Sequence, residues 1–320
     1  MTFAGSPGRA EAQLVPEAGY ELDTFEIAGL PRSPSADLVR SLLLAGKAPI
    51  ACGRILARRR PDVVLGGGGY VAGPMVVAAA ARRIPSALME ADAHLGLANR
   101  LATPFAKRVF LAFPIAGREG GKYRVTGRPV PTRAKPVPRD EARRQFELPG
   151  EGPLLLVYGG SQGARSLNEL VVDRFGEEGP LVLHLAGERD YEELKGRVRR
   201  EGYRLLAYTH HFGAALAAAD LALARAGGSV YELAGAGVPA VLVPYPHATA
   251  DHQTKNALHF ERAGAAVLVP EAELGRVMGL VTALLADVGR RAAMADAMRR
   301  VARPAAADEI AEELLTLAAA

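Results

Sequence analysis

One stretch, residues 154–171 (LLLVYGGSQGARSLNELV), limits the possible folds of this chain more than any other. Leu154–Tyr158 is a short apolar run bounded by glycine, which is typical of a buried parallel strand. The two glycines that follow allow a sharp turn, and Ser161 is a natural N-cap for a helix over 162–171. Such a turn presents free backbone N–H groups at a helix start, which suits a phosphate. The alternative is an ordinary strand-to-helix turn without a ligand.

Length and composition indicate a globular protein with more than one domain. The chain has 320 residues, of which 49% are hydrophobic and 23% charged, enough for two domains with a sizeable core. The single cysteine, Cys52, excludes an intramolecular disulfide and is predicted to be a small buried apolar residue. No apolar run reaches the length of about 18 residues that a membrane span needs. The net charge of +4 allows an anionic partner without requiring one.

The helix predicted over 36–60 combines leucines with basic residues. One interpretation is a core-facing amphipathic helix whose basic face is solvated. The other is a helix that rests on an anionic membrane surface, with its leucines in the interface and its cations on headgroups. The residues of this second interpretation, the predicted membrane patch, are Arg40, Leu42, Leu43, Lys47 and Arg54.

Two further features of the first half predict a ligand-binding edge. The run GGGGYVAGP after the strand at 62–65 is a second tight turn, and its glycine density indicates close approach to the backbone. Glu90 and Asp92 follow the strand predicted over 84–89. Open α/β sheets bind ligands just beyond the carboxyl ends of their strands. The alternative role for either acid is to cap a helix.

The chain divides into two α/β halves. Residues 127–138 hold four prolines, which predicts a semi-rigid linker. The second half repeats the strand, glycine turn and helix order, most clearly in RAGGSVYELAGAGVPAVLVPYP. We therefore predict an N-terminal domain over 1–130 and a C-terminal domain over 131–303, with a helix at about 304–320 that packs back on the first. Ligands of such a pair are expected in the cleft between the halves.

Five motifs, in this order, resemble the MurG family: GGGGYVAGP, MEADAHLGLAN, GGSQGAR, the RAGG segment above and DHQTKNA. Members are bacterial hexosyltransferases that use UDP-N-acetylglucosamine (UDP-GlcNAc) to convert lipid I into lipid II for peptidoglycan. The resemblance spans about residues 2–300 and implies two Rossmann-like domains facing across a cleft, the GT-B architecture. It also implies peripheral attachment to an anionic membrane surface at the cytoplasmic face of the bacterial inner membrane. UDP-GlcNAc and undecaprenyl-linked lipid I are the implied partners, with no nucleic acid.

The resemblance assigns roles to individual residues. Ser161 matches a pyrophosphate-side serine, Thr209 a position whose backbone pairs with uracil, and Glu232 an acid that holds both ribose hydroxyls. Gln253 matches a glutamine that hydrogen-bonds the sugar. The implied donor set is Ser161, Gln162, Gly163, Thr209, Gly227, Gly228, Ser229, Glu232, Gln253 and Asn256, and the implied acceptor-side set is Gly68, Gly69, Tyr70 and Gly73.

The family's reaction is a direct attack of the muramyl 4-hydroxyl on the sugar, which inverts the anomeric centre. It needs a base near the hydroxyl and stabilisation of the departing UDP. Helix N-termini and glycine N–H groups can stabilise the diphosphate without a bound metal. The histidines and acids show no metal-ligand spacing, so neither a metal nor a cofactor is expected.

Four departures from the family pattern affect these assignments. The family's acceptor motif usually reads HEQN, whereas this chain has MEAD at 89–92, so Asp92 replaces an amide and Glu90 is kept. The usual opening strand and GGTGGH-type turn, whose histidine has been favoured as the base, are not seen, so Glu90 and Asp92 become the candidate bases. We expect the natural protein to carry roughly 30 more residues upstream, one βαβ element. The family's GNPVR reads GRPVP here, so Arg128 or Arg133 is the candidate donor arginine. The loop before Glu232 is one residue shorter than usual.

Two other functions compete with the transferase. The unusual start and the altered arginine favour a catalytically weak or silent protein that binds UDP-sugars. A related transferase with another lipid acceptor, such as a diacylglycerol, is the second. Turnover of UDP-GlcNAc distinguishes the lipid I transferase from the silent binding protein. The choice of lipid acceptor distinguishes it from the related transferase.

Overall fold

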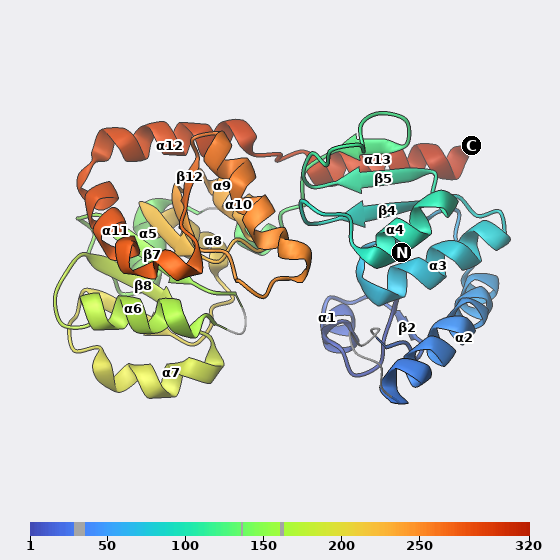
Figure 1. Ribbon diagram of the computed structural model, residues 1–320, viewed down its shortest axis with the longest axis horizontal. Coiled ribbons are helices and arrows are strands. Elements are labelled where there is room, and N and C mark those ends of the chain that lie inside the picture. The colour runs from blue at the N-terminus through green and yellow to red at the C-terminus, as the bar shows by residue number, and fades with distance from the viewer. Residues whose placement is uncertain (29–35, 136, 161–162) are drawn as a thin grey trace. The chain divides into compact units, whose positions relative to one another are not determined.

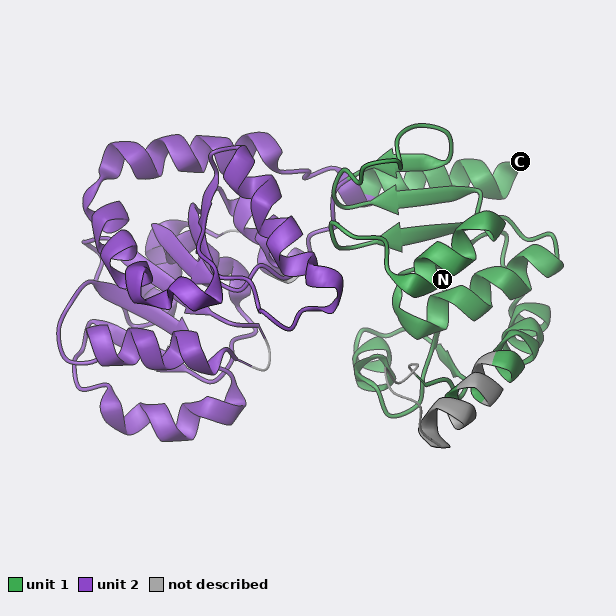
Figure 2. Ribbon diagram, in the orientation of Figure 1, with its two compact units in different colours: residues 1–126, 308–320 green, residues 127–307 purple. Residues whose placement is uncertain are grey.

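The computed structural model describes residues 1–28, 36–135, 137–160 and 163–320, without the side chains of 36–40, 42, 43, 45 and 133. It divides into two compact units, residues 1–126 with 308–320, and residues 127–307 (Figure 2). The predicted boundaries at 130/131 and 303/304 lie a few residues away. The predictions for Ser161, Gln162 and the side chains of Arg40, Leu42, Leu43 and Arg133 fall outside the described residues.

The second unit is built on one parallel sheet of six strands in the order β12-β11-β10-β7-β8-β9 (Figure 1). Numbered from β7, this is the doubly wound order 6-5-4-1-2-3, with its switch point between β7 and β10. All five residues of β7 are buried, as the apolar run predicts. The strands are β7 (Leu154–Tyr158), β8 (Leu181–Leu185), β9 (Tyr203–Leu206), β10 (Leu221–Ala224), β11 (Ala240–Leu242) and β12 (Ala266–Leu268).

Helices cover both faces of this sheet. Right-handed crossovers place α6 and α7 on one face and α8, α9 and α10 on the other, as Figure 1 shows. One core cluster joins the sheet to α6 and α11. The helices are α5 (Arg139–Gln145), α6 (Arg165–Phe175), α7 (Glu188–Leu194), α8 (Phe212–Ala218), α9 (Val230–Ala236), α10 (His252–Arg262), α11 (Val277–Ala286) and α12 (Val288–Val301). Short 3-10 turns are η2 (Thr132–Ala134), η3 (Lys195–Arg197), η4 (Thr249–Asp251) and η5 (Glu271–Arg276).

The first unit holds a four-stranded parallel sheet in the order β3-β4-β5-β6 and a separate parallel pair, β1-β2. Helix α13 crosses to this unit and packs Ile310 against Ala87 and Phe110 of the sheet. The strands are β1 (Phe3–Gly5), β2 (Leu22–Thr24), β3 (Val64–Gly66), β4 (Ser86–Glu90), β5 (Arg108–Leu111) and β6 (Tyr123–Val125). The helices are α1 (Ala10–Glu17), α2 (Ala36–Arg59), α3 (Gly69–Ala81), α4 (Leu97–Ala102), η1 (Thr103–Phe105) and α13 (Ala306–Ala319).

The helix predicted over 162–171 begins three residues later, at Arg165, with Ala164 at the N-cap position. The turn is longer because Gly163 has φ +74° and lies against the Ala186 carbonyl, where a Cβ would come within 2.1 Å of the oxygen. The linker is also partly packed, since Ala134 in η2 is only 2% exposed.

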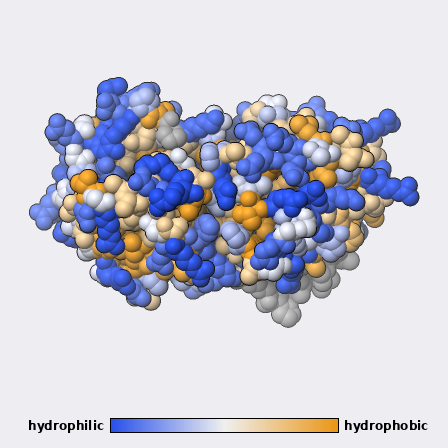
Figure 3. Space-filling model, turned by 90° about the horizontal axis from the view of Figure 1, so that it is seen from above, coloured by the Kyte–Doolittle hydropathy of each residue, from blue (hydrophilic) through white to orange (hydrophobic). Residues whose placement is uncertain are grey.

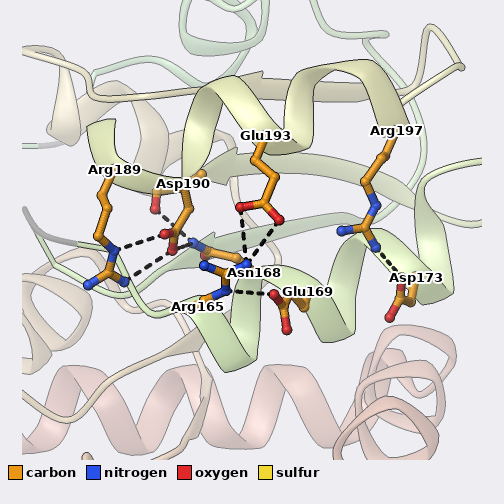
Figure 4. Close-up of polar contacts among 9 residues, drawn as sticks. Arg165, Asn168, Glu169, Asp173, Arg189, Asp190, Glu193 and Arg197 are labelled. Carbon is orange, nitrogen blue, oxygen red and sulfur yellow. Dashed lines mark hydrogen bonds and ion pairs between the residues drawn. The ribbon is translucent and has the colours of Figure 1, made fainter.

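A buried polar chain fixes α6 beneath this turn, and Figure 4 shows its part between Asn168 and Asp190. Asn168 donates through Nδ2 to the Ala186 carbonyl (2.8 Å) and to Asp190 Oδ2 (2.9 Å). Its Oδ1 therefore accepts from His184 Nε2 (2.9 Å), which places the imidazole proton on Nε2. His184 Nδ1 then accepts from the Tyr203 hydroxyl at 2.7 Å. The chain joins α6, β8, β9 and α7 without a solvent contact at His184, which is fully buried.

Around this chain, Figure 4 shows ion pairs between exposed side chains of α6 and those of α7 and η3. Arg165 contacts both Glu169 and Glu193, and Arg197 contacts Asp173. Because these groups are exposed, water and salt screen the pairs and each contributes little to stability. The buried chain is therefore the main polar constraint on the position of α6.

We predict that His184 makes the fold less stable in acid. Burial lowers the pKa of His184 to about 3, whereas the unfolded residue titrates near 6.5. Below pH ~6.5 the unfolded chain binds the proton first, so unfolding becomes easier by about 1.4 kcal/mol per pH unit until pH approaches the folded pKa. Urea unfolding between pH 7 and pH 4 should show this slope in the wild type and a shallower one in His184→Gln. Equal slopes would contradict the prediction.

Candidate functional site

A pocket of about 210 Å³ opens in the second unit at the carboxyl ends of its central strands. This is the switch point, where a doubly wound sheet leaves room for a ligand. Phe212 meets Tyr158 edge to face at 5.2 Å and forms an apolar wall. The pocket is lined by Ala134, Tyr158, Gly160, Leu185, Ala207, Tyr208, Thr209, Phe212, Ser229 and Glu232.

The pocket brings together residues that are far apart in the sequence. Thr209 follows β9 and Glu232 lies in the first turn of α9, yet both line the same cavity. Thr209 Oγ1 accepts the His211 N–H at 3.1 Å, which shapes the loop and leaves recognition to its backbone. Glu232 presents two acceptor oxygens, the chemistry that a vicinal diol requires. Both predicted donor residues therefore lie where a nucleoside can reach them.

Glycine turns follow β7 and β10, the two strands at the switch point. Gly160 and Ser229 line the pocket, and Gly163 packs on Ala186 behind it. A Cβ on Gly228 would come within 1.7 Å of Arg128 Nη1, so a guanidinium lies directly on this turn. Arg128, one of the two candidate donor arginines, is thus a cation on the turn after β10. Gly227, the remaining predicted glycine, is half-buried in the same turn.

The two predicted sugar-side residues of α10 differ in what they can do. Gln253 accepts the Tyr245 N–H through Oε1 at 2.8 Å, which leaves its NH₂ group directed elsewhere. Asn256 is fully buried, and its amide donates to the Ala226 carbonyl at 3.1 Å. Asn256 therefore supports the β10–α9 turn from behind, in place of the direct donor contact that we expected.

In the first unit, Glu90 organises the loop that follows β4. Its Oε1 accepts the N–H groups of Ala91 (3.0 Å) and Asp92 (3.4 Å). Its Oε2 accepts from the Gly96 N–H and from Asn99 Nδ2, both at 2.9 Å. A buried carboxylate with four donors already in place is held by its loop. Of the two candidate bases, Asp92 is the more exposed.

The predicted acceptor-side glycines lie beside this loop. A Cβ on Gly68, which has φ +96°, would come within 3.7 Å of the Met89 carbonyl, and one on Gly73 within 3.7 Å of the Ala98 carbonyl. Helix α3 starts at Gly69, and the Tyr70 side chain is 56% exposed. The turn and the Glu90 loop therefore form one edge of the first sheet.

Sequence reasoning missed two residues, Arg225 and Glu271. Arg225 follows β10 and is 8% exposed, and its guanidinium forms an ion pair with Glu271 of η5. The signal for Arg225 was present in the RAGG segment, but Glu271 lies in no motif.

Neither a metal site nor a membrane span is evident in the described parts of the chain. No three His, Cys, Asp or Glu side chains of these parts gather closely enough to hold a metal ion. None of the helices within them is long and apolar enough to cross a bilayer. On the face drawn in Figure 3, hydrophobic side chains form small groups among hydrophilic ones.

Sequence comparisons place both halves of the chain in one family. Residues 2–111 match the glycosyltransferase family 28 N-terminal domain, and residues 154–313 match its C-terminal domain. A relative from Halothermothrix orenii is 36% identical over 95% of this chain and 87% of its own length. One from Salinibacter ruber is 40% identical over 99% and 88%, respectively. Both are named UDP-N-acetylglucosamine–N-acetylmuramyl-(pentapeptide) pyrophosphoryl-undecaprenol N-acetylglucosamine transferase.

Solved structures agree. MurG from Acinetobacter baumannii superposes with a TM-score of 0.77 at 27% identity, covering 98% of this chain and 90% of that one. The calicheamicin glycosyltransferase CalG4 shares the fold, with a TM-score of 0.69 at 18% identity over 98% and 90% of the two chains. These matches confirm the predicted pair of Rossmann-like domains of the GT-B class and the resemblance to MurG. The chain belongs to glycosyltransferase family 28.

Proposed function

We propose that this chain is an inverting hexosyltransferase that moves GlcNAc from UDP-GlcNAc to the muramyl 4-hydroxyl of lipid I, giving lipid II. The observation that carries the proposal is the pocket at the switch point of the second unit. There a carboxylate, Glu232, and a loop backbone at Thr209 flank two glycine turns. The names of relatives that share 36–40% of their residues over nearly the whole chain support the same reaction.

The pocket residues suit the parts of a UDP-sugar. Glu232 accepts hydrogen bonds from both ribose hydroxyls, and the Thr209 backbone pairs with uracil. The glycine turns and α9 direct N–H groups at the diphosphate, and Arg128 offsets the charge that builds up on departing UDP. No step in this scheme needs a resident metal or cofactor.

Release of UDP from UDP-GlcNAc with a lipid I analogue tests this function directly. Turnover with lipid I and none with diacylglycerol supports the proposal. Turnover with diacylglycerol alone means a related transferase with another acceptor. UDP binding without turnover on either acceptor means a silent UDP-sugar-binding protein.

We predict that Glu232→Gln weakens UDP binding by about 10- to 100-fold, because the amide offers one acceptor where the carboxylate offers two. Titration calorimetry with UDP measures the loss. The matched control is Glu178→Gln, an exposed acid before β8 at the opposite edge of the sheet. Equal affinities of the two variants for UDP would exclude Glu232 from the ribose site.

For the catalytic base we propose Asp92. Glu90 is buried and accepts four hydrogen bonds within its own loop, whereas Asp92 on the same loop is half-buried and so more accessible to an acceptor hydroxyl. Asp92 then removes the proton of the muramyl hydroxyl as it attacks, and Glu90 keeps the loop in shape.

Asp92→Asn should lower kcat by about 10²- to 10⁴-fold with little change in the melting temperature, since a general base is lost. Glu90→Gln should instead lower the melting temperature and raise the KM for the acceptor. The NH₂ group of the new glutamine would face N–H groups that now donate to the Glu90 carboxylate. Steady-state kinetics and thermal unfolding separate the two effects, with Glu119→Gln as the exposed control. A kcat near the wild-type value in Asp92→Asn would rule out this base.

We also propose that the first unit rests on the anionic cytoplasmic surface of the bacterial inner membrane. Of the predicted membrane patch, Lys47 and Arg54 are exposed on α2, beside Ile50 at 62% exposure. A second apolar stripe follows α4 and η1, where Leu97, Leu101 and Phe105 are 52%, 63% and 49% exposed.

The charges around the α4–η1 stripe support an anionic surface. Residues 93–118 contain no Asp or Glu. Arg100 and Lys107 are exposed on the same segment. Exposed leucines with flanking cations are typical of interfacial helices.

The double variant Leu101→Ser, Phe105→Ser should lose about tenfold or more in affinity for phosphatidylglycerol vesicles, through lost burial of apolar area. Vesicle sedimentation measures this. Leu315→Ser, on α13 of the same unit and 70% exposed, is the matched control. Turnover of a water-soluble lipid I analogue should stay unchanged in both. Unchanged vesicle binding in the double variant would remove the stripe from the membrane contact.

A further inference from the structure

The partly buried ion pair of Arg225 and Glu271 joins four segments of the second unit. Arg225 donates through Nη1 to one oxygen of Glu271 and through Nη2 to the other, the latter at 3.2 Å. Nη2 also donates to Ser166 Oγ at 3.0 Å, in the first turn of α6. Nη1 reaches the carbonyls of Val243 (3.1 Å) and Pro244 (3.2 Å) after β11. Since Arg225 precedes the β10–α9 turn, one guanidinium links the segments on both sides of the switch point.

Glu271 keeps this guanidinium in place. Burial alone would raise the pKa of Glu271, but the hydrogen bonds from Arg225 and Ser166 outweigh burial and hold the pKa below its usual value. Ser166 Oγ also donates to Glu271 Oε1 at 2.6 Å. The carboxylate is therefore ionised at neutral pH and restricts the guanidinium to one orientation.

The Pro244 carbonyl lies next to a residue that orients the sugar side of the site. Arg225 lies over the Tyr245 ring, 5.7 Å from its centroid. The Tyr245 N–H in turn donates to Gln253 Oε1 at 2.8 Å. This hydrogen bond orients the Gln253 amide so that its NH₂ group faces away from Tyr245. A shift of the turn at Pro244 would release this amide.

We propose that Glu271 is a positioning residue for the donor sugar, acting through Arg225, the Pro244–Tyr245 turn and Gln253. The inference rests on the proposed function, and it adds selectivity for the sugar to a pocket that already binds the nucleotide. Glu271 does not contact the donor itself.

The nucleotide part of the site does not depend on this pair. Asn168 ties α6 to Ala186 and Asp190 through the separate buried chain of Figure 4. Glu232 lies on α9, and Thr209 lies on the loop after β9. The hydrogen bonds of the Arg225–Glu271 pair go instead to Ser166 of α6 and to the carbonyls of Val243 and Pro244. Loss of Glu271 should therefore spare UDP and weaken UDP-GlcNAc.

Glu271→Gln tests the proposal, because it keeps the side chain's shape and removes its charge. We expect the Kd and KM for UDP-GlcNAc to rise about tenfold, a loss of about 1.4 kcal/mol. The Kd for UDP should stay within about twofold by the same calorimetry. In a Gln253→Ala background the same substitution should have almost no further effect, since both act on one contact.

Glu273→Gln is the matched control. Glu273 lies two residues further in η5 and pairs with Arg276 at an exposed site, so this variant should bind both ligands as the wild type does. Equal behaviour of the two variants, or parallel losses for UDP and UDP-GlcNAc with a lower melting temperature in Glu271→Gln, would overturn the proposal. A wild type that binds neither ligand would instead overturn the proposed function.

Discussion

The constraint on which the rest of the structure depends is the reversal of strand order between β7 and β10. Neighbouring strands there send their connections to opposite faces of the sheet, so a space stays open at their carboxyl ends. Both strands leave the sheet through glycine turns, and these let the backbone approach a ligand without side chains in the way. The pocket, the cation at Arg128 and the acid at Glu232 all follow from that opening.

Polar contacts beneath the opening keep its parts in register. The chain from Asn168 to Tyr203 holds α6 against β8 and β9 on one side. The Arg225–Glu271 pair holds the ends of β10 and β11 on the other. Because His184, Asn168 and Arg225 are buried, a hydrogen bond lost at any of them would leave a donor or acceptor unsatisfied. These contacts therefore fix geometry more than they add stability.

In the first unit an acid also lies at the carboxyl end of a strand, but its oxygens hold the loop that follows. Glu90 lies at the end of β4, where a ligand contact is expected, yet its oxygens accept from the backbone and from Asn99. The loop gains a fixed shape, on which the neighbouring Asp92 is half-buried. An acid at a strand end can thus build a site without acting in its chemistry.

Much of this was predictable from the sequence. The apolar run bounded by glycine located β7, and α2 has nearly its predicted bounds. The motifs predicted the family and the GT-B class, which the comparisons confirm. Local predictions succeeded where short-range physics decides, because periodicity and turn chemistry act between neighbours in the chain.

Long-range contacts decided what the sequence alone did not determine. Helix α6 starts at Arg165, and Gly163 before it packs on the carbonyl of Ala186, just after β8. Asn256 turned out to support a turn because the sheet buries it completely. Glu271 lies in no sequence motif, and it pairs with Arg225 only because the fold brings η5 next to the end of β10. The sequence by itself determined which elements form and what family they belong to. Only the tertiary structure decided which side chains face the pocket, because burial and hydrogen-bond partners come from segments far apart in the chain.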